Sequence, residues 1–210
     1  MTTGIFITFE GGEGAGKSTQ IRRLAQRLNV AGHEVVLTRE PGGSEGAEAI
    51  RDLVLNGPAE KWSAVTETLL MYAARRDHLE RVIRPALERG CIVLCDRFAD
   101  STRAYQGAGG DVDPDLIEAM ERHVVEGAWP DLTLILDLPV TEGLARAASR
   151  GGGEARFESK GQAFHERLRA AFLAIAEREP GRCVVVAADQ SIDAVEGAIW
   201  AAVEPRLKAR

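Results

Sequence analysis

Short apolar runs alternate along the chain with longer stretches that carry apolar residues at every third or fourth position. The short runs are rich in aliphatic residues and predict five strands, at Ile5–Phe9, Glu34–Thr38, Cys91–Cys95, Leu132–Leu138 and Cys183–Ala187. The longer stretches predict helices, at Lys17–Ala31, Ser44–Leu55, Ser63–Glu88, Asp113–Glu126, Thr141–Ser149, Gln162–Arg178 and Ser191–Leu207. Pro85 is expected to bend the longest of these helices. Together the elements predict an α/β fold, a five-stranded parallel sheet with helices on both faces, because strands buried on both sides read as continuous aliphatic runs.

Composition sets limits on the class of protein. The chain has 210 residues, of which 45% are hydrophobic, so residues 1–210 are expected to form a single domain. A net charge of −6 argues against a nucleic-acid polymer or an anionic membrane surface as a partner. The sequence contains no apolar run of 18 residues, so we expect a cytoplasmic protein without a membrane partner. Its three cysteines lack metal-type spacing and are expected to be reduced core thiols.

A glycine-rich loop follows the first predicted strand and leads into the first predicted helix. It matches the phosphate-loop pattern G-x-x-x-x-G-K-[ST]. In such a loop the backbone N–H groups bind phosphate oxygens, the lysine adds a positive charge, and the hydroxyl reaches a phosphate-bound Mg²⁺. We therefore predict a nucleoside-triphosphate site at Gly11, Gly12, Glu13, Gly14, Ala15, Gly16, Lys17, Ser18 and Thr19.

Polar and basic side chains gather where the predicted second and third strands end. They are Arg39 and Glu40, followed by Arg51, and then Asp96 and Arg97, followed by Ser101, Tyr105 and Gln106. The carboxyl ends of parallel strands lie at one edge of a sheet, so this group should lie beside the phosphate loop. Arginines there predict a second anion site, as an enzyme needs when it transfers a phosphoryl group between two phosphorylated molecules.

A flexible, basic segment interrupts the helical pattern after residue 149. Three glycines, at residues 151–153, are flanked by Arg146, Arg150, Arg156 and Lys160. Glycine favours mobility, and arginine favours phosphate contacts, so residues 146–160 predict a lid that closes over the phosphates. The alternative is a solvated surface loop.

These motifs together resemble the thymidylate kinase family. The resemblance rests on the segments Phe9–Thr19, Thr38–Gly43, Asp96–Phe98 and Ala104–Gly107, with Arg75, His78, Ser101 and Arg156–Glu158. Because the phosphate loop has no basic residue at its variable positions while the lid is basic, the chain is similar to the bacterial subtype. The resemblance implies a P-loop nucleoside monophosphate kinase-like fold. It also implies transfer of the γ-phosphoryl group of ATP to dTMP with Mg²⁺, and a homodimer.

The resemblance also implies roles for single residues. On the donor side, Lys17 should bridge the phosphates, Thr19 should support the loop, Ser18 and Asp96 should hold Mg²⁺, and Arg150 or Arg156 should act as an arginine finger. On the acceptor side, Arg39, Arg51 and Arg97 should surround the phosphate of dTMP. The nucleoside should meet Glu13 at its 3′-hydroxyl, Arg75 and Gln106 at the base, Tyr105 under the 2′ position, and Ser101 and Thr102 near the sugar. Met71 stands where family members commonly have a phenylalanine that stacks on thymine. Met71 can pack on the ring through its sulfur, or alternatively Tyr72 or Phe98 supplies the aromatic surface.

Two other functions are compatible with a phosphate loop. One is a P-loop kinase for another nucleoside monophosphate or small molecule, although a neutral acceptor does not call for three convergent arginines. The other is a regulatory ATPase. Among the remaining residues, we expect a structural role for His78, the end of a strand at Asp137, and surface positions for His33, His123 and His165. Glu10 has either a capping or a direct role.

Overall fold

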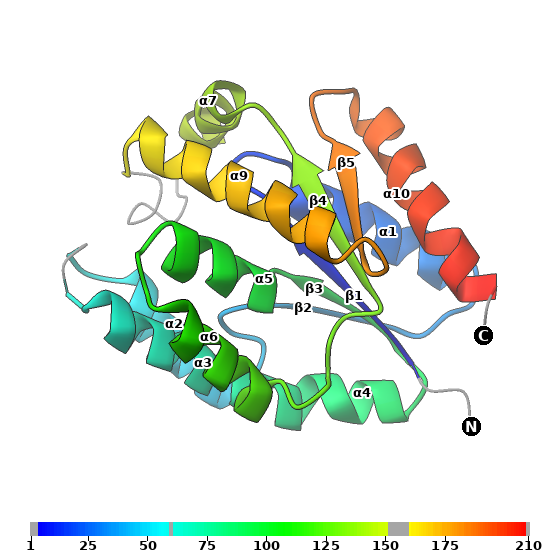
Figure 1. The fold of residues 1–210 in the computed structure, drawn as a ribbon. Helices are drawn as coiled ribbons and strands as arrows, with labels where there is room; N and C mark the ends of the chain where they lie inside the picture. Colours follow the sequence, from blue (N-terminus) through cyan, green and yellow to red (C-terminus); the bar gives the residue numbers. More distant parts are fainter. Residues whose placement is uncertain (1–3, 59–60, 151–159, 209–210) are drawn as a thin grey trace.

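The computed structural model describes residues 4–58, 61–150 and 160–208, and only the backbone of Arg150. A five-stranded parallel sheet forms its centre, with strand order β2-β3-β1-β4-β5 (Figure 1). The strands are β1 (Ile5–Glu10), β2 (Val35–Arg39), β3 (Ile92–Asp96), β4 (Leu132–Asp137) and β5 (Cys183–Ala187). This confirms the predicted fold class, with strand ends within one residue of those expected.

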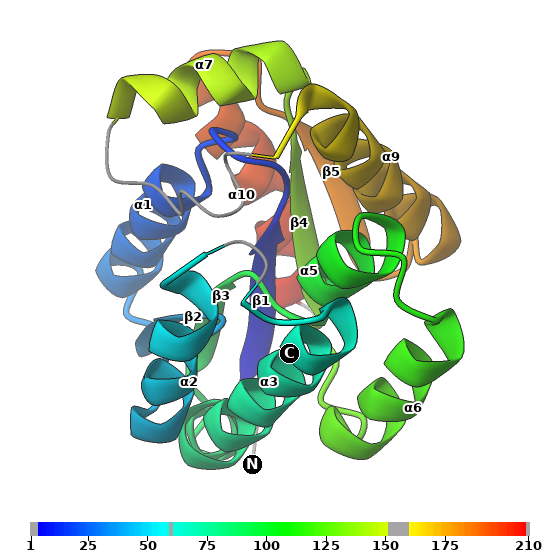
Figure 2. The ribbon, with the colours of Figure 1, turned by 90° about the vertical axis from the view of Figure 1, so that its left-hand side faces the viewer.

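Helices cover both faces of the sheet. They are α1 (Lys17–Val30), α2 (Glu45–Leu55), α3 (Ala64–His78), α4 (Arg84–Glu88), α5 (Ala99–Thr102), α6 (Pro114–Val124), α7 (Val140–Arg150), α9 (Gln162–Arg178) and α10 (Ile192–Lys208). Helices α1 and α10 pack together on one face, and α9 contacts β4 and β5 from the other (Figure 2). Helix α4 contacts β3. No helix in the described part of the chain combines the length and the apolar character needed to cross a membrane.

Side chains of the central strand β1 alternate between the two cores. Ile5, Ile7 and Phe9 pack with α1 and α10, whereas Phe6 packs against the other face with residues of α4 and β3. Because helices cover the sheet on both sides of β1, all six of its residues are buried. The three cysteines are free and buried, as predicted.

The long helix predicted at Ser63–Glu88 is present but not uniform. Between α3 and α4, the segment Leu79–Ile83 is π-helical, and the Arg84 N–H donates to the carbonyl of Leu79. Proline lacks an N–H, and its ring clashes with the carbonyl four residues earlier, so the wider turn accommodates Pro85. The predicted effect of Pro85 is therefore seen as a change from α-helix to π-helix in the turn that precedes it.

The helical segment that follows β3 was not predicted from the sequence. Helix α5 continues into a π-helical segment, Arg103–Ala108. This stretch is short and begins with polar residues, so periodicity gave no signal. Burial of Ala99, Ala104 and Tyr105, and the ion pairs of Asp100, stabilise it through contacts with distant elements.

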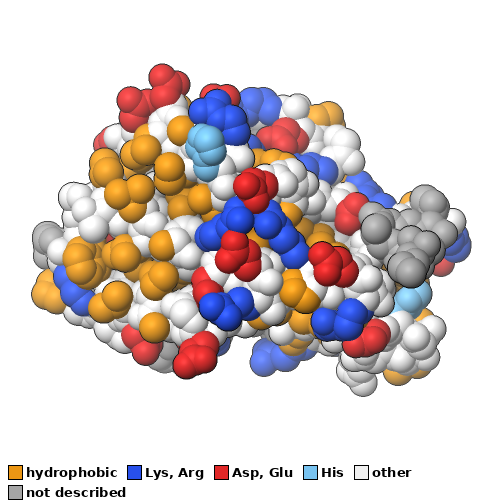
Figure 3. All heavy atoms as spheres, turned by 90° about the horizontal axis from the view of Figure 1, so that it is seen from below, with side chains coloured by type: hydrophobic (Ala, Val, Ile, Leu, Met, Phe, Trp, Pro, Cys, Tyr) orange, Lys and Arg blue, Asp and Glu red, His pale blue; other side chains and the backbone are white. Residues whose placement is uncertain are grey.

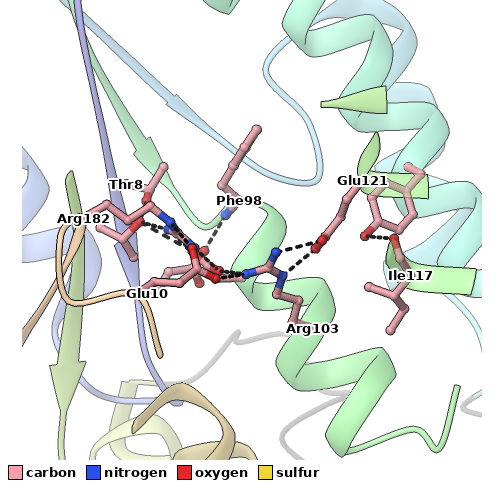
Figure 4. A network of polar contacts seen from close by, with 11 residues as sticks. Thr8, Glu10, Phe98, Arg103, Ile117, Glu121 and Arg182 are labelled. Carbon is pink, nitrogen blue, oxygen red and sulfur yellow. Dashed lines mark hydrogen bonds and ion pairs between the residues drawn. The ribbon is translucent and has the colours of Figure 1, made fainter. Parts of the chain in front are cut away.

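A buried polar network joins α5 to the far strands (Figure 4). The Asp100 carboxylate is fully buried and accepts two hydrogen bonds from Arg182, at 2.7 and 2.8 Å. Arg182 also donates to Thr133, at 2.8 Å, while Arg103 pairs with Glu121, at 2.6 Å. The network holds the segment after β3 against β4 and β5, and this segment forms one wall of the site described below.

We expect Asp100→Ala to lower the free energy of unfolding by about 3 kcal/mol, because it leaves the Arg182 guanidinium buried with too few acceptors. Urea unfolding at neutral pH measures this loss. Lys208→Ala is the matched control, since it removes an exposed ion pair with Glu204 and should change stability by less than about 1 kcal/mol. Equal effects of the two substitutions would contradict the assignment.

Candidate active site

The phosphate loop connects β1 to α1 at the carboxyl edge of the sheet. Two of its glycines are required by their surroundings. A Cβ on Gly11, whose φ is 130°, would lie 2.4 Å from the Leu136 carbonyl oxygen. A Cβ on Gly14, whose φ is 70°, would lie 2.1 Å from the carbonyl oxygen of Gly143 at the start of α7. Any side chain at these positions would therefore separate the loop from β4 and from α7.

Lys17 lies across this loop. Its Nζ donates to the carbonyl oxygens of Gly11, at 3.0 Å, and Gly12, at 2.9 Å. Burial, together with the nearby Arg97, lowers the pKa of Lys17. The ammonium group is thus held at the mouth of the loop, as expected for a residue that contacts phosphates.

Ser18 and Asp96 are the two predicted metal ligands. Ser18 lies in the first turn of α1, next to Asp96 at the carboxyl end of β3. The Ser18 hydroxyl donates to Asp96 Oδ2 at 3.0 Å. Within the described residues, no group of three or more His, Cys, Asp or Glu side chains could hold a metal ion. A hydroxyl and one carboxylate suit Mg²⁺ bound mainly by phosphates and water, since Mg²⁺ prefers few protein oxygen ligands.

A pocket opens beside the loop, between the ends of β2 and β3 and helices α3 and α5. It is lined by Glu40, Pro41, Leu55, Met71, Arg75, Arg97, Phe98, Ser101, Thr102, Tyr105 and Gln106. Seven of the predicted acceptor residues are therefore brought together around one pocket, although they come from sequence positions 71 to 106. The carboxyl-edge location agrees with the position expected from strand order.

Arg97 links this pocket to the phosphate loop. Its guanidinium donates to Glu13 Oε1 at 2.9 Å and to the Gly11 carbonyl at 3.2 Å, and it faces the Tyr105 ring at 4.9 Å. Tyr105 also donates its hydroxyl to Glu13 Oε1, at 2.7 Å. Burial raises the pKa of Glu13, but Arg97, Lys17 and the Tyr105 hydroxyl outweigh it and lower the value to about 2. Glu13 is therefore ionised and holds Arg97 and Tyr105 in place.

Arg75 is buried at the back of the pocket. It donates to Glu40 at 2.7 Å and to Thr102 at 3.0 Å, while in the described part of the chain its Nη1 has no hydrogen-bond partner. Glu40 also contacts His78 Nδ1, at 3.0 Å, and His78 Nε2 lies 2.7 Å from the Thr38 hydroxyl. Arg75 and His78 outweigh the effect of burial and lower the pKa of Glu40. His78 thus has the structural role expected, and Glu40 is a site residue whose role the sequence did not indicate.

Of the three residues expected to pack on the base, Met71 and Phe98 line the pocket and Tyr72 does not. Tyr72 is buried behind the pocket, and Arg75 lies 4.9 Å from its ring centre. Phe98 lines the pocket, but its side chain is fully buried and Arg75 lies 5.2 Å from its ring centre. Met71 is half-buried in the lining and remains the more accessible apolar surface. Gln106 is held by Glu67, to which its Nε2 donates at 2.9 Å, a pairing that no sequence motif signals.

Arg39 and Arg51 lie outside the lining of this pocket. Arg39 is exposed and pairs with Glu48 at 3.0 Å, in a cleft that it shares with Ser18 and Asp96. Arg51 donates to the carbonyl of Pro41, at 2.7 Å, and so lies next to the pocket wall. Both arginines are therefore close to the site, but in the described structure they contact other protein groups.

A second cleft lies on the opposite side of the phosphate loop. Arg146 and Ser149 of α7 line it together with the loop after β5, through Ala188, Gln190 and Ser191. Arg146 donates to the Ala188 carbonyl at 3.2 Å and pairs with Glu142. The side chain of Arg150, and Arg156 with most of the predicted lid, lie outside the described residues.

One position was predicted wrongly. His165 was expected at the surface, but it is 4% exposed and packs edge-on against Phe164 in α9. Helix α9 places His165 in a cleft that it lines together with Gly11, Gly12 and Glu13 of the phosphate loop, a proximity that its neighbours in sequence do not indicate. Asp137 does end a strand, as expected, and its carboxylate pairs with Arg169 at 2.6 Å.

The model of the thymidylate kinase family matches residues 9–199 of the chain. The chain belongs to the thymidylate kinase family. It is 70% identical over 207 residues to the thymidylate kinase of Caulobacter vibrioides, covering 99% of each chain. It is 58% identical to that of Nitrobacter winogradskyi, covering 97% of this chain and 89% of the relative. The crystal structure of thymidylate kinase from Ehrlichia chaffeensis superposes with a TM-score of 0.78 at 34% identity, covering 96% of this chain and 99% of the other.

Phosphorylation of dTMP is the function of the thymidylate kinase family, and it is the activity of this chain. The enzyme class and the resemblance to bacterial members are thereby confirmed, since these relatives come from bacteria. The match to a solved thymidylate kinase also confirms the predicted P-loop nucleoside monophosphate kinase-like fold.

The low pKa of Glu13 predicts how pH changes the stability of this thymidylate kinase. A carboxyl whose pKa falls from 4.5 to about 2 on folding stabilises the protein above pH 4.5, by about 3 kcal/mol, and loses that contribution as the pH falls toward 2. Urea unfolding of the wild type and Glu13→Gln should therefore differ most at pH 6–7 and converge in acid.

The control for this comparison is Glu118→Gln, which changes an exposed glutamate of α6 and should alter stability by less than about 0.5 kcal/mol at any pH. A difference between wild type and Glu13→Gln that stays constant from pH 7 to pH 3 would show that the ion pair with Arg97 does not hold Glu13 ionised.

Proposed function

We propose that this thymidylate kinase binds ATP at the phosphate loop and dTMP in the pocket around Arg75 and Arg97. The observation that carries this assignment is the contact of Arg97 with Glu13, at 2.9 Å, because one guanidinium then belongs to both sites. Two phosphorylated molecules repel each other, and a shared positive charge between them reduces that repulsion where the phosphoryl group is transferred.

We assign the metal to Ser18 and Asp96. These two side chains would hold the cation together with phosphate and water oxygens, and it would supply positive charge for the phosphoryl transfer. Lys17 adds a charge over the same phosphates, and the backbone of Gly11–Thr19 binds them. Asp96 has little need to act as a base, because the acceptor phosphate is already a nucleophile.

For dTMP, the buried donors of the pocket determine the orientation. Arg97 binds the acceptor phosphate, with Arg39 and Arg51 close enough to add positive charge at its edge. Arg75 Nη1 is a buried donor without a partner in the described part of the chain, so a base carbonyl oxygen would satisfy it. Thr102 and Gln106 complete the polar lining, and Met71 packs on the base face.

Glu13 and Tyr105 together recognise the sugar of the acceptor. The Tyr105 hydroxyl donates to Glu13, so the phenol ring is held rigidly at the sugar end of the pocket, near Ser101. Glu13 accepts the 3′-hydroxyl, while the fixed ring leaves no space for a 2′-hydroxyl. We infer that this pair selects deoxyribose.

We further propose a homodimer in the cytoplasm. Exposed aliphatic side chains gather over α2 and α3, at Leu53, Val65 and Leu69, and Figure 3 shows hydrophobic side chains over one end of this face. A contiguous exposed apolar area is typical of a subunit interface. The charged cluster beside it contains Arg76, Glu80, Arg84 and Glu126 and supports a polar rim.

The function is tested by ADP release from ATP and Mg²⁺ with dTMP, dUMP, UMP, CMP, AMP and thymidine offered separately as acceptors. We expect a strong preference for dTMP and a loss of about 10²–10³-fold in kcat/KM in Arg97→Ala, because a charged donor at the transferring group is removed. Arg206→Ala, on the distant α10, is the control and should stay within about twofold. Equal turnover of UMP would contradict the selectivity, and acceptor-independent hydrolysis would favour a regulatory ATPase.

The lid arginines are tested separately. We propose that Arg150 or Arg156 stabilises the transition state as an arginine finger, an effect worth about 10³–10⁵-fold in kcat in other phosphoryl-transfer enzymes. Each is replaced by alanine, with the exposed Arg167 of α9 replaced as the control. Losses in kcat below about tenfold in both lid variants would overturn this assignment.

A further inference from the structure

Glu10 is a buried carboxylate that the described chemistry leaves without a role. It is the last residue of β1 and its side chain is completely buried. It accepts a hydrogen bond from the Phe98 N–H at 2.7 Å, drawn in Figure 4, and another from the Ser101 hydroxyl at 2.6 Å. Both donors belong to the segment after β3, so Glu10 ties β1 to the turn that carries Arg97.

That turn holds Arg97 in an unfavourable backbone conformation. Its φ of 70° lies in the left-handed region, which residues other than glycine seldom adopt. The Arg97 N–H donates to the Phe9 carbonyl at 2.9 Å, and the next N–H, of Phe98, donates to Glu10. The residue is therefore anchored on both sides by the end of β1, which keeps the guanidinium directed at the phosphate loop.

Ser101 connects Glu10 to the Arg97 side chain. A serine hydroxyl has one proton, and here Ser101 donates it to Glu10. Its lone pairs are then available to Arg97 Nη1, which lies 3.2 Å away. A carboxylate can only accept, so ionised Glu10 sets the direction of the Ser101 hydroxyl and provides Arg97 with an acceptor.

Ionising the Glu10 carboxyl is energetically costly because the side chain is buried. Burial raises the pKa of Glu10 and the neighbouring Asp100 raises it further, while Ser101, Arg97 and Phe98 partly oppose this and leave it at about 8. The positive charges of Lys17 and Arg75 also face Glu10. The Glu10 carboxyl is therefore largely ionised only above about pH 8, and at that pH its charge must be held by the hydrogen bonds from Phe98 and Ser101.

We propose that Glu10 is a positioning residue for the acceptor phosphate, acting through Ser101 and the Phe98 N–H to hold the Arg97 guanidinium over the phosphate loop. This inference rests on the role of Arg97 given under the proposed function. Glu10 touches neither substrate, and its effect is confined to where and how firmly Arg97 is held.

Glu10→Gln keeps the shape but changes the pattern of donors. The amide oxygen still accepts from the Phe98 N–H, whereas the amide nitrogen donates to Ser101. The amide nitrogen then occupies one lone pair of the Ser101 oxygen and the Ser101 proton loses its acceptor, so the hydroxyl is no longer oriented for the Arg97 guanidinium. The substitution should therefore weaken the contact of Arg97 with Ser101, while its contacts with Gly11 and Glu13 and the fold of the turn stay in place.

The test is steady-state kinetics at pH 9, where Glu10 is ionised, with dTMP and ATP varied in turn. We expect the KM for dTMP to rise about five- to tenfold in Glu10→Gln and in Ser101→Ala, as for loss of one hydrogen bond to a charged group. The KM for ATP should stay within about twofold, and the double variant should match the single variants, because Glu10 acts through Ser101.

Thr8→Val is the matched control. Thr8 lies two residues earlier on the same side of β1, is also fully buried, and is hydrogen-bonded to Thr133 at 2.9 Å, away from Arg97 (Figure 4). The substitution Thr8→Val should lower thermal stability but leave the KM for dTMP within about twofold. If Glu10→Gln does not fold, Ser101→Ala still carries the test, since it removes the same acceptor.

Three results would overturn the proposal: an unchanged KM for dTMP in Glu10→Gln and Ser101→Ala, an equal rise in the KM for ATP, or additive effects in the double variant. A wild type that shows no dTMP-dependent ADP release would instead contradict the proposed function, so the two failures are distinguishable.

Discussion

The ion pair between Arg97 and Glu13 is the interaction on which the site depends. It joins the phosphate loop after β1 to the turn after β3, and these segments are 84 residues apart in sequence. The pair has side chains that are each 12% exposed, so its attraction is only weakly screened by water. Through it, the donor and the acceptor sites share one wall, and neither can shift without the other.

The phosphate loop has little freedom to adapt, because it is packed against α7 from above. A Cβ on Gly14 would lie 2.1 Å from the Gly143 carbonyl oxygen, and a Cβ on Gly143 would lie 2.5 Å from the Glu13 carbonyl oxygen. Two glycines thus let the helix that leads into the predicted lid rest directly on the loop. Movement of α7 is thereby mechanically linked to the loop that carries Glu13.

Buried charge is concentrated on the segment after β3. Asp100 faces Arg182 and Arg103, Glu10 faces the Asp-Arg-Phe turn, and Glu40 faces Arg75. Each buried carboxylate has at least one charged or hydrogen-bonding partner, as expected where desolvation is costly. The pairing fixes a short polar helix, α5, that has too few apolar residues to be stable by itself, and it does so next to the pocket.

The sequence by itself determined the features that local rules encode. Alternating apolar runs predicted the parallel sheet, the glycine and lysine pattern predicted the phosphate loop, and the spacing of motifs after β2 and β3 indicated the acceptor arginines, because these signals depend on near neighbours. The tertiary structure alone decided which partners meet. The burial of His165, the pairing of Asp100 with Arg182, the contact of Glu10 with Ser101 and the helical form of residues 99–108 all depend on residues brought together from distant parts of the chain. Such contacts leave no period in the sequence, since the free energy that stabilises them comes from burial and pairing across the fold.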